Sequence, residues 1–209
     1  MSDQKIIYLA NRKKSQNQKK FSKMLFLIIL LAALLGVFLW NKFIEETANL
    51  DVQIPESKNI SFASQAPIPM STEHVAQLFE SADDRPILLY IYTTWCGICS
   101  KNFPILNEIA REFQNTELQI ITLAIDRNLE PQVLRDYLNQ FGEVYFEPRF
   151  LAFKEGFAEF LQKKQIRYGG KIPYTVLFSR DGEIITKYVG SKSKKYLRNK
   201  IISELYPRN

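Results

Sequence analysis

The sequence predicts an α/β domain in which a mixed β-sheet carries helices on both faces, preceded by one N-terminal transmembrane helix. Three observations predict this arrangement. Apolar, β-forming runs alternate with segments of helical period along residues 71–209, which favours a sheet whose strands are connected through helices. Two further β-forming runs flank Asp181-Gly182 and predict a terminal hairpin. Met24 to Trp40 contains no charged residue, which is typical of a membrane span.

The N-terminal apolar run is long enough for a retained anchor. With Lys42 reaching toward the headgroups, residues 24–44 provide about 20 positions, enough for a helix to cross the hydrocarbon core. A cleaved signal peptide is the alternative, but its apolar region is usually only about 7–15 residues and ends at a small-residue cleavage site. Residues 1–23 carry a net charge of +6, so the positive-inside rule places them in the cytoplasm and the chain beyond the anchor outside it.

The rest of the composition excludes several classes of function. Outside residues 1–23 the chain has 21 basic and 21 acidic residues, so the exported part lacks the positive charge of an electrostatic nucleic-acid binder. The chain has only two cysteines, Cys96 and Cys99, and they cannot form a disulfide framework that staples the fold. Because His74 is the only histidine, a histidine-rich metal site is excluded as well.

The first elements of the exported part have local signals. Residues 45–70 contain three prolines and no sustained period, which predicts a linker between anchor and domain. Ser71 or Thr72 can cap a first helix, where the predicted domain begins. Residues 86–92 are apolar on both faces, which indicates a central strand covered by helices.

The later elements are predicted in the same way, from runs of β-forming residues and from apolar residues at helical spacing. Phe103, Leu106 and Ile109 share one face at helical spacing. After the first strand the predicted order is a helix over 99–113, a strand over 118–125, a helix over 131–141, an extended piece over 144–150, a helix over 154–166, strands over 174–179 and 183–189, and a helix over 192–205.

The residues that carry chemistry are Cys96 and Cys99, which straddle the predicted junction between a strand and a helix. Free backbone N–H groups and the dipole at a helix start stabilise a thiolate at the first cysteine. The second cysteine lies one turn later, close enough to close a disulfide. Such a pair can attack a partner's disulfide and then resolve the mixed intermediate. A zinc site would need two further ligands, and His74 is the only histidine that could contribute one.

The motif around the cysteines resembles thioredoxin. Trp95-Cys96-Gly97-Ile98-Cys99 is followed by Pro104 at the position where a proline kinks the active-site helix of that family. The resemblance continues through Asp126 at the end of the next strand and through Ile172-Pro173 before the hairpin, and it covers about residues 71–209. It implies a thioredoxin fold and a thiol–disulfide oxidoreductase without a cofactor or a metal.

The resemblance also implies a role for each of these residues. Cys96 is expected to be the attacking and more exposed thiol, and Cys99 the buried thiol that resolves the mixed disulfide. Trp95, Ile172 and Pro173 are expected to contact the substrate, with Pro173 in a cis peptide bond; core packing is the alternative for Trp95. Asp126 is either a proton-transfer group or a residue that caps the end of its strand.

Two departures from thioredoxin indicate a subfamily. The 47 residues from Asp126 to Pro173 are more than a minimal thioredoxin needs, which predicts an insertion at about 128–165. Together with the anchor, the insertion resembles membrane-tethered thioredoxin-like proteins of the TlpA/ResA kind, some of which reduce apocytochrome c or other exported thiols. Tyr90 and Thr122 stand where thioredoxin carries a buried acid and its lysine partner. This replacement leaves open how Cys99 loses its proton.

The sequence therefore predicts a single-pass protein of the cytoplasmic membrane, with its catalytic domain on the periplasmic or extracytoplasmic side. The resemblance implies that such a protein reduces disulfides of exported proteins, for example in cytochrome c maturation, and we expect a membrane protein to supply it with electrons. Three alternatives stay open. The first is a disulfide oxidase or isomerase of the same fold. The second is a copper(I) chaperone that uses both thiolates and His74. The third is a redox-inert binding domain.

Overall fold

The structure is a computed structural model that describes residues 34–39 and 60–206 of the 209-residue chain. The chain divides into two compact units, residues 1–51 and 52–209. In the first unit residues 34–39 are helical. The remainder of the predicted anchor and the basic segment 1–23 lie outside the described residues. Within 34–39 and 60–206, no helix combines the length and apolarity that a membrane span requires.

The second unit is built on one six-stranded sheet with the strand order β1-β4-β3-β2-β5-β6. Strands β1, β4, β3 and β2 run parallel, whereas β5 is antiparallel to β2 and β6 is antiparallel to β5. The sheet is therefore mixed, as predicted. The strands are β1 (Ile68–Met70), β2 (Ile87–Tyr92), β3 (Gln119–Ala124), β4 (Arg149–Leu151), β5 (Tyr174–Phe178) and β6 (Ile184–Val189).

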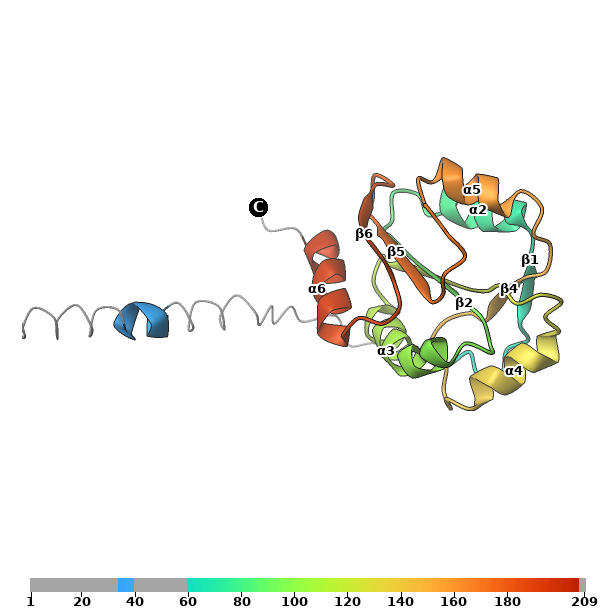
Figure 1. Cartoon of the computed structure of the whole chain (residues 1–209), viewed down its shortest axis with the longest axis horizontal. Helices are drawn as coiled ribbons and strands as arrows, with labels where there is room; N and C mark the ends of the chain where they lie inside the picture. Colours follow the sequence, from blue (N-terminus) through green and yellow to red (C-terminus); the bar gives the residue numbers. More distant parts are fainter. Residues whose placement is uncertain (1–33, 40–59, 207–209) are drawn as a thin grey trace, which may run out of the picture. The chain divides into compact units, whose positions relative to one another are not determined.

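Helices cover both faces of this sheet, as Figure 1 shows. On one face lie α2 (Thr72–Glu80) and α5 (Phe157–Lys163). On the other lie α3 (Gly97–Phe113), α4 (Pro131–Asn139) and α6 (Lys194–Leu205). These helices match the predicted ones within a few residues at each end. The largest difference is at α5, which begins only at Phe157 because Gly156 precedes it in the left-handed conformation, with φ of 72°.

The side chains of the central strand β2 divide between the two faces. All six of its residues are buried, as its apolar composition predicted. Leu89 and Ile91 pack into the core on the side of α2 and α5, where Phe79 and Phe160 meet edge to face at 5.4 Å. Tyr90 and Tyr92 point the other way and are core aromatics. The Tyr92 ring lies 6.0 Å from that of Tyr137 on α4.

The domain begins earlier than residue 71, which corrects the end of the predicted linker. Ile68–Met70 forms β1, and its three residues pair with β4. Upstream of β1, the backbone N–H of Phe62 donates to the carbonyl of Val144 at 2.6 Å. A three-residue strand that follows Pro67 and contains Pro69 has no local strand signal. Proline is tolerated there because β1 lies at the edge of the sheet. Only pairing with β4 makes this segment a strand.

The predicted insertion at 128–165 contains α4, β4 and α5. The sequence placed an extended piece at 144–150, whereas β4 spans only Arg149–Leu151. In the sheet, β4 lies between β1 and β3. The insertion therefore adds a strand to the sheet, and the loop that follows β4 lies at the same edge as the loops that follow β2 and β3.

Candidate redox site at Cys96 and Cys99

Cys96 and Cys99 lie where β2 passes into α3. After Tyr92 the chain makes a short turn, in which the backbone N–H of Cys96 donates to the carbonyl of Thr93 at 3.4 Å. Cys96 is the N-cap of α3, and its Sγ accepts a hydrogen bond from the backbone N–H of Cys99 at 3.2 Å. The two residues form a disulfide, with their Cα atoms 5.1 Å apart. The helix start therefore stabilises negative charge on the sulfur of Cys96.

The two cysteines differ in access to solvent. Cys96 is 7% exposed and Cys99 only 1%, so Cys96 is the more exposed residue, as expected for the attacking thiol. Trp95 beside it is 75% exposed and Ile98 is 55% exposed. The alternative that Trp95 packs into the core is therefore wrong. The indole ring stands at the surface next to the disulfide, where a partner chain can contact it; contact with a substrate stays a prediction.

Asp126 is buried and bonded to the turn that precedes the cysteines. Its carboxylate accepts a hydrogen bond from the hydroxyl of Thr94 at 2.6 Å, and each of its oxygens lies 3.1 Å from the backbone nitrogen of Thr94. Asp126 follows β3 and is 6% exposed. It therefore ties the end of β3 to the turn after β2, the structural role that the sequence offered. Proton transfer by this carboxylate stays a prediction.

The loop before β5 lies at the same edge of the sheet. The Ile172–Pro173 peptide bond is cis, as the resemblance implied. Tyr174 pairs with Ile91 near the end of β2, which places Pro173 beside the strand end from which the dithiol turn departs. Pro173 is buried and Ile172 is half-buried. The carbonyl of Pro173 accepts from the backbone N–H of Gly190 at 2.9 Å, so the end of β6 holds this loop.

Behind the cysteines, a polar chain occupies the region where thioredoxin has its acid and lysine. The amide of Asn102 donates to the hydroxyl of Tyr90 at 3.4 Å, and Ser191 donates to Asn102 at 2.7 Å. Burial raises the pKa of Tyr90 well above its ordinary value, so the phenol stays protonated at neutral pH. Thr122 is buried and donates to the carbonyl of Glu147.

Sequence reasoning missed Asn102 and Ser191. Asn102 is a polar residue one turn after Cys99 and on the buried side of α3, which is a weak local signal. Ser191 carries no signal at all, because 89 residues separate it from Asn102. Tyr90, Asn102 and Ser191 are all uncharged at neutral pH. This polar chain therefore supplies no carboxylate that could accept the proton of Cys99.

His74 does not join the dithiol. It lies on α2, on the face of the sheet opposite α3, and it is exposed, as predicted. Its Nδ1 accepts from the backbone N–H of Ser71 at 3.3 Å, in a capping box at the start of the helix. Among the described residues, no three metal-ligating side chains converge. The third ligand that a copper site would need is thus committed to a helix cap elsewhere.

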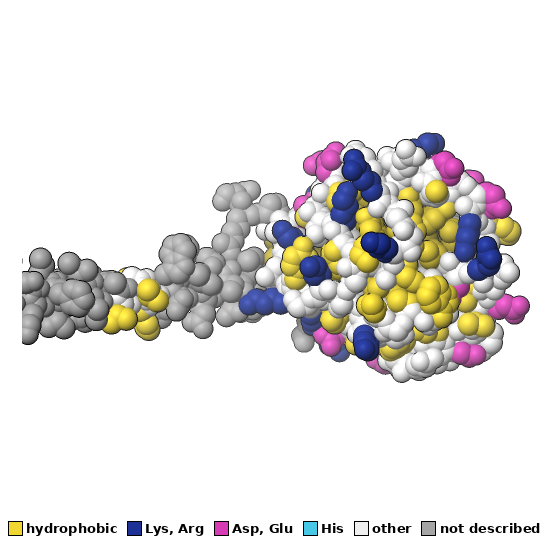
Figure 2. Space-filling model, viewed as in Figure 1, with side chains coloured by type: hydrophobic (Ala, Val, Ile, Leu, Met, Phe, Trp, Pro, Cys, Tyr) yellow, Lys and Arg dark blue, Asp and Glu magenta, His cyan; other side chains and the backbone are white. Residues whose placement is uncertain are grey.

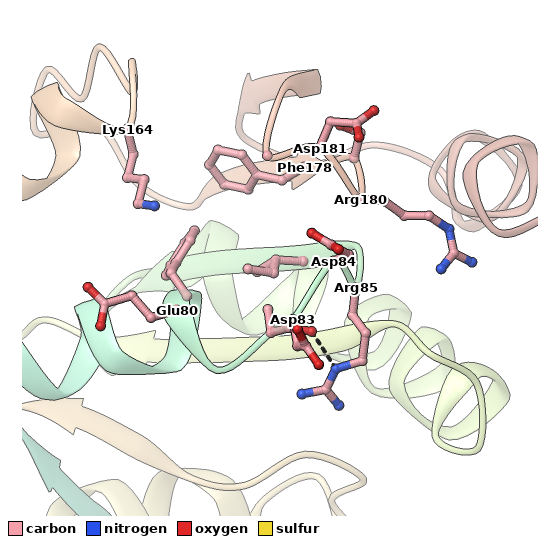
Figure 3. A pocket seen from close by; sticks show the side chains of 13 residues that line it. Glu80, Asp83, Asp84, Arg85, Lys164, Phe178, Arg180 and Asp181 are labelled. Atoms are coloured by element: carbon pink, nitrogen blue, oxygen red, sulfur yellow. Dashed lines mark hydrogen bonds between the residues drawn. The ribbon is translucent and has the colours of Figure 1, made fainter.

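A separate hollow lies at the opposite edge of the sheet, between the loop before β2 and the β5–β6 turn (Figure 3). Side chains of both signs line it. Arg85 is held in place there, since its guanidinium donates to the carbonyl of Ala82 at 2.7 Å and to that of Ser81 at 2.9 Å. This hollow shares no residue with the dithiol site. The charged residues that line it are Glu80, Asp83, Asp84, Arg85, Lys164, Arg180 and Asp181.

Comparisons with known proteins agree with this geometry. The family model described as Thioredoxin matches residues 70–165. The thiol-disulfide oxidoreductase ResA of Bacillus thuringiensis (strain Al Hakam) is 24% identical over 184 residues, which cover 85% of this chain and 94% of ResA. Thioredoxin of Mycolicibacterium smegmatis is 32% identical over 72 residues, 34% of this chain and 59% of that protein.

Solved structures of two similar proteins also match the chain. StoA from Bacillus subtilis superposes with a TM-score of 0.45 at 19% identity, covering 57% of this chain and 84% of StoA. A thiol:disulfide interchange protein from Chlorobium tepidum TLS superposes with a TM-score of 0.49 at 15% identity, covering 72% of this chain and 99% of that one. By its family match, its Cys-X-X-Cys pair and its curated relatives, the chain carries a thioredoxin-like domain and resembles the thiol–disulfide oxidoreductases of the ResA kind.

Proposed function

We propose that this protein is a membrane-anchored thiol–disulfide oxidoreductase that reduces disulfides of exported proteins. The coarser class rests on the site and on the relatives: the protein is a thiol–disulfide oxidoreductase with a Cys-X-X-Cys pair. The observation that carries the proposal is the placement of Cys96. Its sulfur caps α3 and accepts from the backbone N–H of Cys99, and the residue is more exposed than Cys99.

The reaction follows from this placement. The thiolate of Cys96 attacks one sulfur of the partner's disulfide, whose S–S bond breaks as the mixed disulfide forms, and the released partner sulfur takes up a proton. Cys99 then loses its proton and attacks the sulfur of Cys96. The mixed S–S bond breaks, the second partner thiol leaves, and the Cys96–Cys99 bond remains. Two electrons have passed from the protein to its partner.

The direction of electron flow is the finer part of the proposal. Strong oxidants stabilise their reduced form through a very acidic thiolate. Here Gly97 and Ile98 separate the cysteines, and Lys101, one turn into the helix, is exposed to solvent. The charged group bonded into the dithiol turn is a carboxylate, Asp126, rather than a cation. These features favour a reductant over an oxidase or isomerase.

The location is proposed from the sequence. Residues 24–44 anchor the protein in the cytoplasmic membrane, and the positive segment 1–23 stays in the cytoplasm. The catalytic domain then lies in an oxidising compartment, so a reductant there must be recharged after each turnover. A membrane protein that carries electrons from the cytoplasm is the proposed donor, because anchoring both proteins raises their encounter rate. Apocytochrome c is one candidate substrate.

The redox state of the cysteines in living cells tests this proposal. Acid quenching and alkylation with a mass-tagged maleimide separate the dithiol form from the disulfide form. We expect most of the protein in the dithiol form, and a shift to the disulfide when the electron donor is removed. A protein that is mainly disulfide in wild-type cells would favour the oxidase or isomerase reading. A double Cys96→Ser, Cys99→Ser variant that retains function would refute the redox role altogether.

A further inference from the structure

The large apolar side chains that the described part of the domain exposes gather at one edge of the sheet. Among residues 60–206 seven such side chains are exposed, and five of them lie in the segments that follow β2, β3 and β4 or at the end of β6. Phe153, in the loop after β4, is 64% exposed, second only to Trp95 among these seven. The five are Trp95, Ile98, Val133, Phe153 and Val189, and we call them the apolar patch.

The topology brings the patch residues together. Because β2, β3 and β4 are parallel, the loops that follow them leave the sheet at the same edge. Strand β6 ends there too, since Val189 pairs with Tyr174 at the start of β5. The loop of Phe153 is fixed to this edge, because the ammonium of Lys154 donates to the carbonyl of Ile125 at 2.9 Å. Figure 2, drawn as Figure 1, shows apolar side chains over the start of α3 and of β5.

Cations stand around this patch. Arg127 follows Asp126, Lys171 precedes Ile172, and both are exposed. In Figure 2 Lys and Arg side chains lie beside the apolar area, whereas Asp and Glu side chains lie mainly toward the outline of the domain. The four cations of this edge are Arg127, Lys154, Lys171 and Lys192, and we call them the cationic rim.

The charge of the rim is only partly offset by nearby acids. Within residues 60–206, the salt bridges join none of the four rim cations to a carboxylate. The loops of this edge carry two exposed carboxylates, Glu130 and Glu155. A third carboxylate of these loops, that of Asp126, is buried and accepts a hydrogen bond from Thr94. Lys192 is held over the rings of Tyr188 and Tyr196, at 6.0 and 5.7 Å. The edge around the dithiol therefore combines an apolar surface with a small excess of positive charge.

We infer that this face selects extended polypeptide segments that carry apolar or aromatic residues beside their disulfide and acidic residues further out. In this reading Phe153 of the insertion and Trp95 hold the apolar residues, and the rim attracts the acidic ones. Opposite charges across an interface raise the rate of encounter and suppress partners of the wrong sign. The inference deepens the proposed function and rests on it, because it names the class of substrate that the dithiol reduces.

Two peptide disulfides of equal length test it. Each contains one Cys-X-X-Cys disulfide beside a phenylalanine, and flanks of glutamate in one peptide are replaced by lysine in the other. The full chain in a neutral detergent is reduced with dithiothreitol, freed of it, and mixed with one peptide at a time. One turnover breaks the peptide S–S bond, forms the Cys96–Cys99 bond and leaves two peptide thiols. We expect the acidic peptide to react about tenfold faster at low salt, and the difference to shrink as salt is added.

Two variants with matched controls assign the effect to the face. Lys171→Glu should slow the acidic peptide about threefold to tenfold and speed the basic one. Lys200→Glu makes the same charge change on α6. Lys200 lies one turn from Glu204, whose carboxylate accepts from the backbone N–H of Arg180 at the opposite edge. This control should leave both rates near wild type. Phe153→Ala should slow both peptides alike, whereas Ile60→Ala, at a similarly exposed apolar residue, should not.

Each outcome decides between readings. Equal rates for the two peptides, with no effect of Lys171→Glu, overturn the inference and leave the proposed function intact. Failure of the wild type to reduce either peptide or a small disulfide such as cystine refutes the proposed function itself. An anionic lipid surface is the competing occupant. If phosphatidylcholine vesicles containing phosphatidylglycerol slow the reaction, pure phosphatidylcholine vesicles do not, and the peptides show no charge preference, the face binds lipid and the inference is wrong.

Discussion

The carboxylate of Asp126 holds Thr94, accepting from its hydroxyl at 2.6 Å and from its backbone N–H. Thr94 lies two residues before Cys96, and Asp126 lies two residues after β3. This contact joins the ends of two neighbouring parallel strands and fixes the turn that presents the first cysteine. The dithiol is therefore positioned from β3 as well as from the start of α3.

Removal of this carboxylate should loosen the turn. In Asp126→Ala the part-buried N–H and hydroxyl of Thr94 lose their acceptor, so we expect the free energy of unfolding to fall by about 1–3 kcal/mol. Glu130→Ala is the control, because Glu130 is exposed and its side chain makes no capping hydrogen bond. Urea denaturation of both variants measures the difference. Equal losses in the two would show that the Asp126–Thr94 contact contributes nothing to stability.

The order of attack predicts an asymmetric trap. Cys99→Ser removes the resolving thiol, so partner proteins should accumulate as mixed disulfides on Cys96. Cys96→Ser should trap few, because Cys99 is only 1% exposed. Non-reducing gels of envelope proteins, followed by mass spectrometry of the adducts, read out both variants. Equal trapping by the two would reverse or abolish the assigned roles.

The potential of the dithiol should be that of a reductant. With Gly97 and Ile98 between the cysteines and a carboxylate in the preceding turn, we expect a value nearer to about −270 mV, as in thioredoxin, than to about −120 mV, as in a strong oxidant. Equilibration of the purified full chain with glutathione buffers, quantified by alkylation, gives the potential. A value above about −170 mV would contradict the reductant assignment and favour the oxidase or isomerase.

The proposed orientation in the membrane predicts the side on which the C-terminus lies. A reporter fused after Asn209 should be active only if it requires export, because the positive charge precedes the apolar run. N-terminal sequencing of the mature protein is the companion measurement. A chain that begins beyond Trp40 would show that the anchor is removed. A reporter active only in the cytoplasm would invert the proposed topology.

Buried phenols should make stability fall at alkaline pH. Burial raises the pKa of Tyr90 and of Tyr92 above their ordinary values, and the Tyr92 hydroxyl has no hydrogen-bond partner among the described residues. Since the unfolded chain ionises near about pH 10, their contribution is complete below that pH. It is lost progressively as the pH rises toward their folded values. Circular dichroism and tyrosinate absorbance should therefore change together above about pH 10.

A conservative substitution isolates this effect. Tyr92→Phe removes a buried hydroxyl that bonds to nothing, so stability at neutral pH should hold or rise slightly. The alkaline unfolding midpoint should move upward, because one fewer buried group is forced to ionise. Tyr206→Phe, at an exposed residue, is the matched control and should leave the midpoint in place. An unchanged midpoint in Tyr92→Phe would show that other groups govern alkaline unfolding.

Much of the site could be predicted from local sequence. The spacing of Cys96 and Cys99 at the start of a helix puts the two sulfurs within reach of each other and places Cys96 beside a free backbone N–H group. The cis bond before Pro173 followed from the resemblance of a short loop. The strands of 87–92 and 119–124 were predictable because short runs that are apolar on both faces are typical of central strands covered by helices on either side.

The remaining features depend on contacts between distant segments. Pairing with β4 turns Ile68–Met70 into a strand, although its prolines indicate a linker. Asp126 meets Thr94 across 32 residues and Ser191 meets Asn102 across 89, and no local pattern announces either bond. That Trp95 and Phe153 lie at the same edge also follows from the parallel pairing of β2, β3 and β4. The sequence by itself determined the redox chemistry, because that chemistry needs only two thiols one helical turn apart. The tertiary structure decided what surrounds them, because which side chains meet at a sheet edge depends on how distant strands pair.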